Sequence, residues 1–169
     1  EVRRLRELSF KHIVQCYGIS KSPMSSDVLI VTECLEGGSL YQSLQQARVV
    51  DARLSDLSFL TIASHIAKGL SYVHDSGFIH GDMKPHNVLL TGSINIDAEA
   101  HIADFPPYVD AKIADFGMSK RLQGGPGSDL LISAVEFGNQ AFGTFAYMAP
   151  EIFSGAMHLD NEELKRVDV

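Results

Sequence analysis

Three side chains of complementary chemistry lie close together in the segment HGDMKPHN, residues 80–87. Asp82, Lys84 and Asn87 offer a carboxylate, an ammonium group and an amide within six residues. Facing one cleft, the carboxylate could accept a proton from a substrate hydroxyl and the ammonium could steady a phosphate. The amide oxygen could bind a hard metal ion. The segment therefore predicts a site for reactions at a phosphate.

Two later segments hold further residues of this kind. Asp115 ends an apolar strand-like run and is followed by Phe116 and Gly117, so a carboxylate stands just before a residue that can turn sharply. Farther along, the segment GTFAYMAPE, residues 143–151, has Pro150 where extended chain would give way to a short helix. Together with residues 80–87, these segments define the candidate site.

Hydrophobic periodicity indicates the elements that must position these residues. The clearest is a core helix over residues 55–76, with Gly77 at its C-terminal cap. A second helix begins after Ser39 as its N-cap. Paired strands are predicted over 12–19 and 28–35, short strands over 88–90 and 111–114, and helices over 1–9 and 161–169. Strands before Gly37 and helices after it predict two unequal lobes with a cleft between them.

The composition is that of an ordinary globular protein. The 169 residues, 45% apolar, can form one sizeable core. A net charge of −7 argues against a nucleic-acid-binding surface, and the short apolar runs argue against a membrane span. Two cysteines, Cys16 and Cys34, favour a reducing and therefore cytoplasmic location. The first and last residues suggest an internal piece of a longer protein.

The order of the three segments resembles that of the eukaryotic protein kinases. His80, Gly81, Asp82 and Asn87 match the pattern H-R-D-x-x-x-x-N, residues 115–117 match D-F-G, and residues 149–151 match A-P-E. The resemblance implies an α+β, bilobal kinase-like fold that is incomplete. Residues 1–36 would be part of the small lobe (end of helix C, strands 4 and 5, hinge). Residues 37–169 would be part of the large lobe (helices D and E, catalytic loop, an insert at about 92–110, activation segment 115–151, start of helix F).

The resemblance also implies a role for each matching residue. Asp82 would orient the acceptor hydroxyl as a base, Lys84 would neutralise the transferred phosphoryl group, and Asn87 and Asp115 would hold Mg²⁺ against ATP. The implied nucleotide-binding residues are Thr32 as gatekeeper, Glu33, Cys34 and Leu35 as hinge, Ser39, Leu89 and Asp115. The implied regulatory residues are Glu1, Phe116, Gly117 and Thr144.

The kind of kinase is also indicated. Lys84 and the Gly143-Thr144 pair point to serine/threonine specificity, with a protein hydroxyl as the acceptor. The segments GGSLYQSL and GTFAYMAPE are similar to those of kinases at the head of mitogen-activated cascades. The function implied is that of a serine/threonine protein kinase.

The motif Ile-Ala-Asp-Phe occurs twice, ending in Asp104-Phe105 and in Asp115-Phe116. The spacing from Asn87, 17 residues to Asp104 against 28 to Asp115, favours the first copy. Backbone chemistry favours the second, because Pro106 follows the first copy and lacks an N–H, whereas Gly117 follows the second. We therefore assign the metal-binding role to Asp115 and interpret Asp104 as a surface copy of the motif without that role. It lies within the insert, and a turn between strands can accommodate such an insert at little entropic cost.

Some features depart from the kinase pattern. Gly81 replaces the usual arginine, so activity should depend less on phosphorylation of the activation segment, for example at Ser128, Ser133 or Thr144. No Gly-rich loop or strand-3 lysine precedes Glu1, so this fragment alone should be inactive.

Two alternatives remain open. One is a pseudokinase scaffold that binds partners or nucleotide without catalysis. The other is a metal-dependent hydrolase built on His80, Asp82 and His86, which lack helical metal-ligand spacing. The remaining histidines are interpreted as having no role in the site. We expect His65 and His74 to be packing or surface residues, and His12, His101 and His158 to be surface residues.

Overall fold

The computed structural model describes residues 8–22, 24, 27–122, 145–150 and 160–169. Contacts divide these residues into two compact units. The first unit takes residues 70–84 and those described from 115 onward; the second takes the described residues before 70 together with 85–114. The predicted lobe boundary after residue 36 falls inside the second unit, and the two lobes stay a prediction.

Strands β1 (Cys16–Lys21) and β2 (Val28–Thr32) form an antiparallel pair in which Lys21 lies opposite Val28. The predicted pairing is thus confirmed, although β1 begins four residues later than the predicted strand. Residues 12–15 stay out of β1 because they meet another strand, β8 (Ala111–Ile113). There, Ile13 bridges Ile113 in parallel and the Val14 N–H donates to the Ile113 carbonyl.

Helix α2 (Leu40–Val49) begins as the sequence predicts. The Ser39 hydroxyl accepts the Gln42 N–H, and the Gln42 side chain accepts the Ser39 N–H. This reciprocal capping box satisfies two backbone donors that the helix itself leaves unpaired. Ser39, implied as a nucleotide-binding residue, therefore also fixes the start of α2.

Helix α3 (Asp56–Asp75) matches the predicted core helix. Ser55 precedes it and accepts the Ser58 N–H, while Gly77 follows it with a φ of 79°, a left-handed conformation that favours glycine. Ile62 and Val73 are buried along the helix. At Gly69 a Cβ would lie 2.9 Å from the His12 carbonyl oxygen, so glycine permits close packing there.

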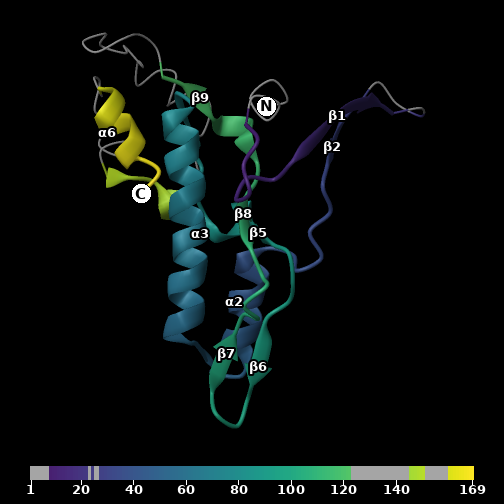
Figure 1. Cartoon of the computed structure of the whole chain (residues 1–169), viewed down its shortest axis with the longest axis vertical. Helices are drawn as coiled ribbons and strands as arrows, with labels where there is room; N and C mark the ends of the chain where they lie inside the picture. Colours follow the sequence, from purple (N-terminus) through teal and green to yellow (C-terminus); the bar gives the residue numbers. More distant parts are fainter. Residues whose placement is uncertain (1–7, 23, 25–26, 123–144, 151–159) are drawn as a thin grey trace. The chain divides into compact units, whose positions relative to one another are not determined.

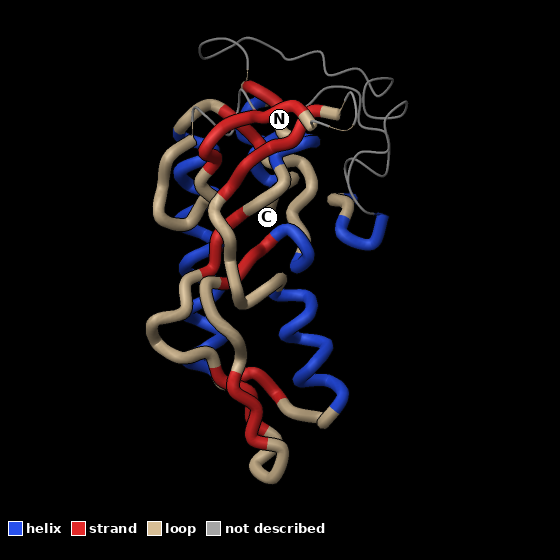
Figure 2. The backbone as a smooth tube through the Cα atoms, turned by 90° about the vertical axis from the view of Figure 1, so that its right-hand side faces the viewer, coloured by secondary structure: helices blue, strands red, loops and turns tan. Residues whose placement is uncertain are grey.

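The insert forms a hairpin instead of a featureless turn. Strands β6 (Asn95–Asp97) and β7 (Ile102–Asp104) pair antiparallel, and β7 also pairs in parallel with β3 (Arg53–Leu54), which gives the order β3-β7-β6. Figure 2 shows the strands of this hairpin in red. The Asp97 carboxylate accepts the N–H groups of Glu99 and Ala100 and so stabilises the hairpin turn.

The core of the second unit lies around strand β5 (Val88–Leu90), which pairs antiparallel with β8 (Figure 1). Val88, Leu90, Ala111 and Ile113 are all buried. Strand β5 follows the 3₁₀ turn η1 (Pro85–Asn87) directly. The short strands predicted over 88–90 and 111–114 are thereby confirmed to within one residue.

The first unit contains short strands and turns. Strand β4 (Phe78–Ile79) pairs antiparallel with β9 (Lys120–Arg121). The 3₁₀ turns η2 (Phe116–Met118) and η3 (Phe145–Tyr147) precede helix α6 (Asn161–Arg166), which Asp160 caps. Helix α6 confirms most of the helix predicted over 161–169, whereas the helix predicted over 1–9 lies almost wholly outside the described residues.

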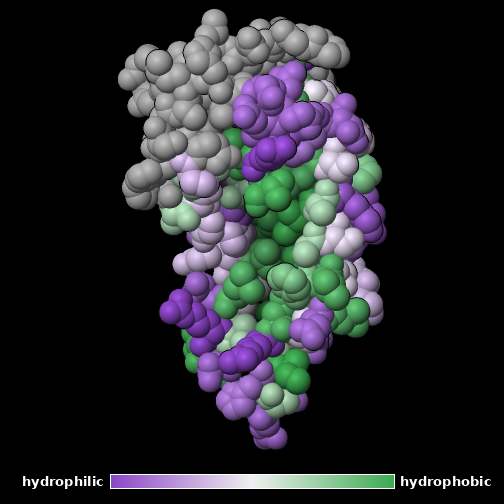
Figure 3. Space-filling model, turned by 90° about the vertical axis from the view of Figure 1, so that its left-hand side faces the viewer, coloured by the Kyte–Doolittle hydropathy of each residue, from purple (hydrophilic) through white to green (hydrophobic). Residues whose placement is uncertain are grey.

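Apolar side chains reach the surface on the face shown in Figure 3. Large exposed apolar residues include Leu57, Phe59 and Leu60 in the first turns of α3. Among the residues that the structure describes, no helix is long and apolar enough to cross a membrane.

Candidate active site

A buried carboxylate fixes the backbone of the candidate catalytic segment. Asp168 is fully buried and accepts the backbone N–H groups of His80 and Gly81 at 2.8 and 2.7 Å. It also contacts His74 Nε2 at 2.9 Å. Gly81 adopts a φ of 80°, which glycine allows without strain. Sequence reasoning did not count Asp168 among the site residues; its link to residues 80 and 81 appears only in the folded chain.

Asp82 and Lys84, two of the predicted catalytic residues, contact each other directly. The Lys84 Nζ lies 2.6 Å from Asp82 Oδ2, and their side chains are 18% and 9% exposed. The Asp82 N–H donates to His80 Nδ1 at 3.3 Å. A carboxylate and an ammonium group are thus held together just after the segment that Asp168 positions.

Asp115 stands at a special backbone position in the first unit. It has a φ of 60° and a ψ of 74°, and its carboxylate accepts the Gly117 N–H at 3.2 Å. Asparagine and aspartate tolerate this left-handed region better than most residues. Phe116, which follows, is fully buried, and its ring meets that of His80 edge-on with centroids 4.9 Å apart. Gly117 supplies the N–H that orients the carboxylate.

The first copy of the repeated motif has a different role. The Asp104 carboxylate accepts hydrogen bonds from the hydroxyls of Ser55 and Ser58, at the start of α3. Ser55 in turn accepts the Ser58 N–H, and Ser58 accepts the Phe105 N–H at 2.8 Å. Asp104 therefore orients the cap of α3. Asp104 is exposed, as predicted for a surface copy of the motif, but it also holds the start of α3 in place.

The two copies differ in the backbone donor that follows the phenylalanine. In the second copy, the N–H two residues after the aspartate donates to its carboxylate. In the first copy this position is Pro106, which has no N–H to donate. The local geometry of Asp115 is therefore not available to Asp104. This observation supports the choice of Asp115 and does not test the metal role itself.

Asn87 and Leu89 lie in the second unit. Asn87 ends η1 and is buried, and its backbone carbonyl accepts the Ala114 N–H at 2.8 Å. Leu89 lies opposite Lys112 in the β5–β8 pair and also bridges Ser39. The structure thus brings Leu89 and Ser39, two of the implied nucleotide-binding residues, side by side.

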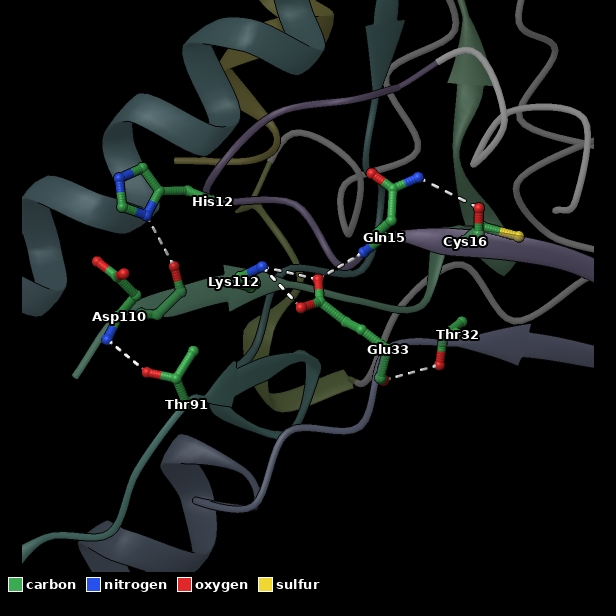
Figure 4. Close-up of polar contacts among 9 residues, drawn as sticks. His12, Gln15, Cys16, Thr32, Glu33, Thr91, Asp110 and Lys112 are labelled. Carbon is green, nitrogen blue, oxygen red and sulfur yellow. Dashed lines mark hydrogen bonds and ion pairs between the residues drawn. The ribbon is translucent and has the colours of Figure 1, made fainter. Parts of the chain in front are cut away.

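The predicted hinge follows β2. The Glu33 carboxylate is held by Lys112 Nζ at 2.7 and 2.8 Å and accepts the Gln15 N–H at 2.7 Å (Figure 4). The backbone of residue 33 is engaged as well: its N–H donates to the Gln15 carbonyl at 3.0 Å, and its carbonyl accepts the Thr32 hydroxyl at 3.2 Å. The contact of this hinge with a nucleotide stays a prediction. Thr32 and Cys34 are exposed, while Leu35 is half-buried. Sequence reasoning missed Lys112 and Gln15, which position Glu33.

One histidine assignment is wrong. His12, expected at the surface, is 5% exposed and its Nδ1 contacts the Ala111 carbonyl at 3.0 Å. His12 is buried because its ring contacts Phe10, His65 of α3 and the Ala111 carbonyl of β8. His101 is exposed as expected, and His65 packs as one of the two predicted options allowed. His158 lies outside the described residues, as do Glu1, Ser128, Ser133, Thr144 and Glu151.

The metal-dependent hydrolase gains no support. Among the described residues, the one group of donors with metal-like spacing is His12, His65 and Asp110. His80, by contrast, is fully buried with its ring against Phe116, and the His86 ring stacks on Tyr41 at 3.8 Å. The Nδ1 of His80 is also engaged by the Asp82 N–H at 3.3 Å.

Three curated relatives match about nine tenths of the chain. The chain is 33% identical over 156 residues to mitogen-activated protein kinase kinase 7 of Arabidopsis thaliana, which covers 92% of this chain and 41% of the relative. It is 33% identical over 153 residues to mitogen-activated protein kinase kinase 9 of the same plant, covering 90% and 39%. It is 32% identical to the serine/threonine-protein kinase SSK22 of Saccharomyces cerevisiae, covering 92% and 11%. The chain thus spans less than half the length of each of these relatives.

A family model described as the protein kinase domain matches residues 1–168. This match confirms the α+β, kinase-like fold class and the predicted resemblance. Because it spans nearly the whole sequence, the chain belongs to the protein kinase domain family.

Proposed function

We propose that the intact protein is a serine/threonine protein kinase, which transfers the γ-phosphoryl group of ATP to a hydroxyl of a protein substrate. The observation that carries the proposal is the buried Asp168 clamp on His80 and Gly81, followed at once by the Asp82–Lys84 contact. Such a clamp fixes a base and a cation relative to one backbone segment. Catalysis of phosphoryl transfer is mainly positioning and charge compensation, which this arrangement supplies.

The donor set fits the cofactors that the family uses. Asn87 and Asp115 would hold Mg²⁺, since an amide oxygen and a carboxylate are the hard ligands that Mg²⁺ prefers. When bound, Mg·ATP supplies the phosphoryl group and the positive charge that offsets its oxygens. The hinge backbone at residues 33–35 would hold the adenine beside the gatekeeper Thr32, with Leu89 under the ring and Ser39 next to it. The contact between Leu89 and Ser39 supports this grouping.

Each residue of the candidate site would have its own role in the transfer. Asp82 would accept the hydrogen bond of the acceptor hydroxyl and take its proton as that oxygen bonds to the γ-phosphorus and the bond from the γ-phosphorus to the ADP leaving group breaks. Lys84, already next to Asp82, would face the transferred group and compensate its negative charge. The Gly117 N–H keeps the Asp115 carboxylate in one orientation, and Phe116 is fixed by its packing against His80.

The regulatory residues and the setting are part of the same proposal. Glu1, Phe116, Gly117 and Thr144 would control the site, and the intact protein would act in the cytoplasm. The names of the two Arabidopsis relatives support a place in a mitogen-activated kinase cascade. The retained Asp82, Lys84, Asn87 and Asp115 favour an active enzyme over a pseudokinase scaffold.

Phosphorylation of a generic acceptor protein by the intact protein tests the proposal. We expect incorporation of phosphate on serine or threonine that requires both ATP and Mg²⁺ and that falls by at least about 100-fold in Asp82→Asn. Asp82→Asn keeps the side chain's size and an acceptor oxygen for Lys84, and a cooperative thermal unfolding transition of the variant excludes a folding defect. Nucleotide binding without any phosphate transfer by the wild type would instead establish the scaffold.

A further inference from the structure

Two histidines stack beside the first residue of β8. The rings of His12 and His65 lie 4.3 Å apart, centroid to centroid, at an angle of 19°. His12 is buried and the side chain of His65 is 14% exposed. His12 belongs to the segment before β1, and His65 belongs to α3. The pair therefore connects two segments that are 53 residues apart in the sequence.

Both rings bind backbone groups of the same residue, Ala111, and these contacts fix which ring nitrogens carry hydrogen. His12 Nδ1 lies 3.0 Å from the Ala111 carbonyl, which can only accept, so this nitrogen carries a hydrogen (Figure 4). The Ala111 N–H donates to His65 Nδ1 at 3.3 Å, so that nitrogen carries none. The hydrogen of neutral His65 then sits on Nε2, which lies 3.7 Å from Asp110 Oδ1.

We propose that His12 and His65 form a pH-sensitive clamp on Ala111, which attaches β8 to α3 and to residues 10–14 while His65 is neutral and releases it when His65 is protonated. A proton added to His65 Nδ1 would place two N–H donors against each other. It would also place a cation on a ring stacked against a second imidazole. Both effects remove the attachment that the neutral ring provides.

The charged groups around the clamp come from all three segments that it joins. Lys11 and Lys68 oppose a positive charge on either ring, whereas Asp110 favours one. Lys11 Nζ lies 2.9 Å from Asp110 Oδ1 and offsets part of that carboxylate's charge. Burial is the largest effect, and it lowers the pKa of both His12 and His65 below their ordinary value of 6.5.

The direction of the pH dependence follows from these shifts. Unfolded histidine titrates near pH 6.5, and the folded rings take up protons only at lower pH. The unfolded chain therefore binds more protons in this range. The stability that the clamp contributes is fully present above pH 6.5 and is lost as the pH falls toward the lowered pKa values. For each histidine, the folding equilibrium constant changes by at most about tenfold per pH unit.

The same cluster does not suit a metal ion. The donor atoms of His12, His65 and Asp110 lie within 4.8 Å of one another. However, the near-parallel rings direct their in-plane lone pairs side by side, so these cannot converge on one ion at about 2.0–2.1 Å. The Nδ1 atoms of both rings are also engaged by Ala111. A proton is therefore the ligand that the geometry favours.

The test combines histidine titration with unfolding of the intact protein. We expect NMR titration to give midpoints below pH 6.5 for His12 and His65. Urea unfolding should show the folding equilibrium constant falling between pH 7.5 and 5.5. The variant His65→Asn keeps an acceptor for the Ala111 N–H and cannot titrate, so it should reduce this fall by up to about tenfold per pH unit. The matched control His101→Asn removes an exposed histidine and should leave the fall unchanged.

Three outcomes would overturn the clamp. They are a His65 midpoint at or above pH 6.5, a pH dependence that is equal in wild type and His65→Asn, and stabilisation by Zn²⁺ at pH 7.5 that His65→Asn abolishes. The last result would establish a metal site. Should His65→Asn fail to fold, the titration of the wild-type protein decides alone. None of these measurements depends on phosphoryl transfer, so they are independent of the proposed function.

Discussion

Replacing Asp104 by alanine separates the roles of the two Ile-Ala-Asp-Phe copies. The substitution removes the acceptor of the Ser55 and Ser58 hydroxyls at the start of α3. It leaves the second copy, with Asp115 and Gly117, intact. We therefore expect Asp104→Ala to destabilise the protein while phosphoryl transfer continues.

The magnitude follows from the two hydrogen bonds that the Asp104 carboxylate accepts, while the N-cap bond from the Ser58 N–H to Ser55 remains. A hydrogen bond of this kind contributes about 0.5–1.5 kcal/mol. A carboxylate at a helix N-terminus adds about 0.3–1 kcal/mol through the helix dipole. Because Asp104 is exposed and solvent screens its charge, we expect a total loss of about 1–2 kcal/mol. In a domain of this size that corresponds to a fall in Tm of about 2–8 °C.

The assay compares three variants of the intact protein by urea unfolding and by phosphate transfer. Asp104→Asn keeps an acceptor oxygen and loses only the charge, so its loss of stability should be about half that of Asp104→Ala. Asp115→Ala should reduce phosphate transfer by at least about 100-fold, because it removes a proposed metal ligand. Both Asp104 variants should keep wild-type transfer once folded.

The reasoning is refuted if folded Asp104→Ala loses phosphate transfer while Asp115→Ala retains it. That result would assign the metal role to the first copy. Unchanged stability of Asp104→Ala would refute the capping role separately.

Three further predictions concern the site and its frame. Asp168→Ala should lower the free energy of unfolding by about 3–5 kcal/mol, measured in urea, because it leaves the buried N–H groups of His80 and Gly81 unpaired. A loss below about 1 kcal/mol would contradict the role of Asp168 in holding this backbone. Gly37→Ala should cost at least about 2 kcal/mol, because its Cβ would lie 2.2 Å from the Gly92 carbonyl oxygen, whereas Gly77→Ala, with open space around it, should cost only about 1 kcal/mol for its positive φ. Since Gly81 stands where the H-R-D pattern of the family has arginine, phosphatase treatment should leave most of the phosphate transfer of the intact protein, and its abolition would show that an activation-segment phosphate is required.

Much of the fold could be predicted because its signals are local. The apolar period, the cap at Ser55 and the Gly77 stop define α3 within a short window. The pairing of β1 with β2 follows from two β-branched runs around a turn. The β6–β7 hairpin was missed because its three-residue strands are too short to show a period, and because its stability depends on pairing with β3.

In the candidate site, too, local signals could be predicted and long-range contacts could not. Asp82, Lys84 and Asn87 could be chosen from their types and spacing alone. Asp168 could not, because it reaches His80 and Gly81 across 88 and 87 residues of sequence. Lys112 and Gln15 were missed for the same reason, since each meets Glu33 only after the chain has folded back.

The sequence by itself determined which copy of the repeat can offer an N–H two residues after its aspartate, since Pro106 excludes this and Gly117 permits it. It also determined the order of the kinase motifs and the limits of the long helix. Only the tertiary structure decided that Asp104 orients the cap of α3, that Asp168 holds the catalytic segment, and that His12 is buried against His65. The physical reason is that periodicity and covalent chemistry act over a few residues, whereas burial and long-range hydrogen bonds exist only once distant segments pack together.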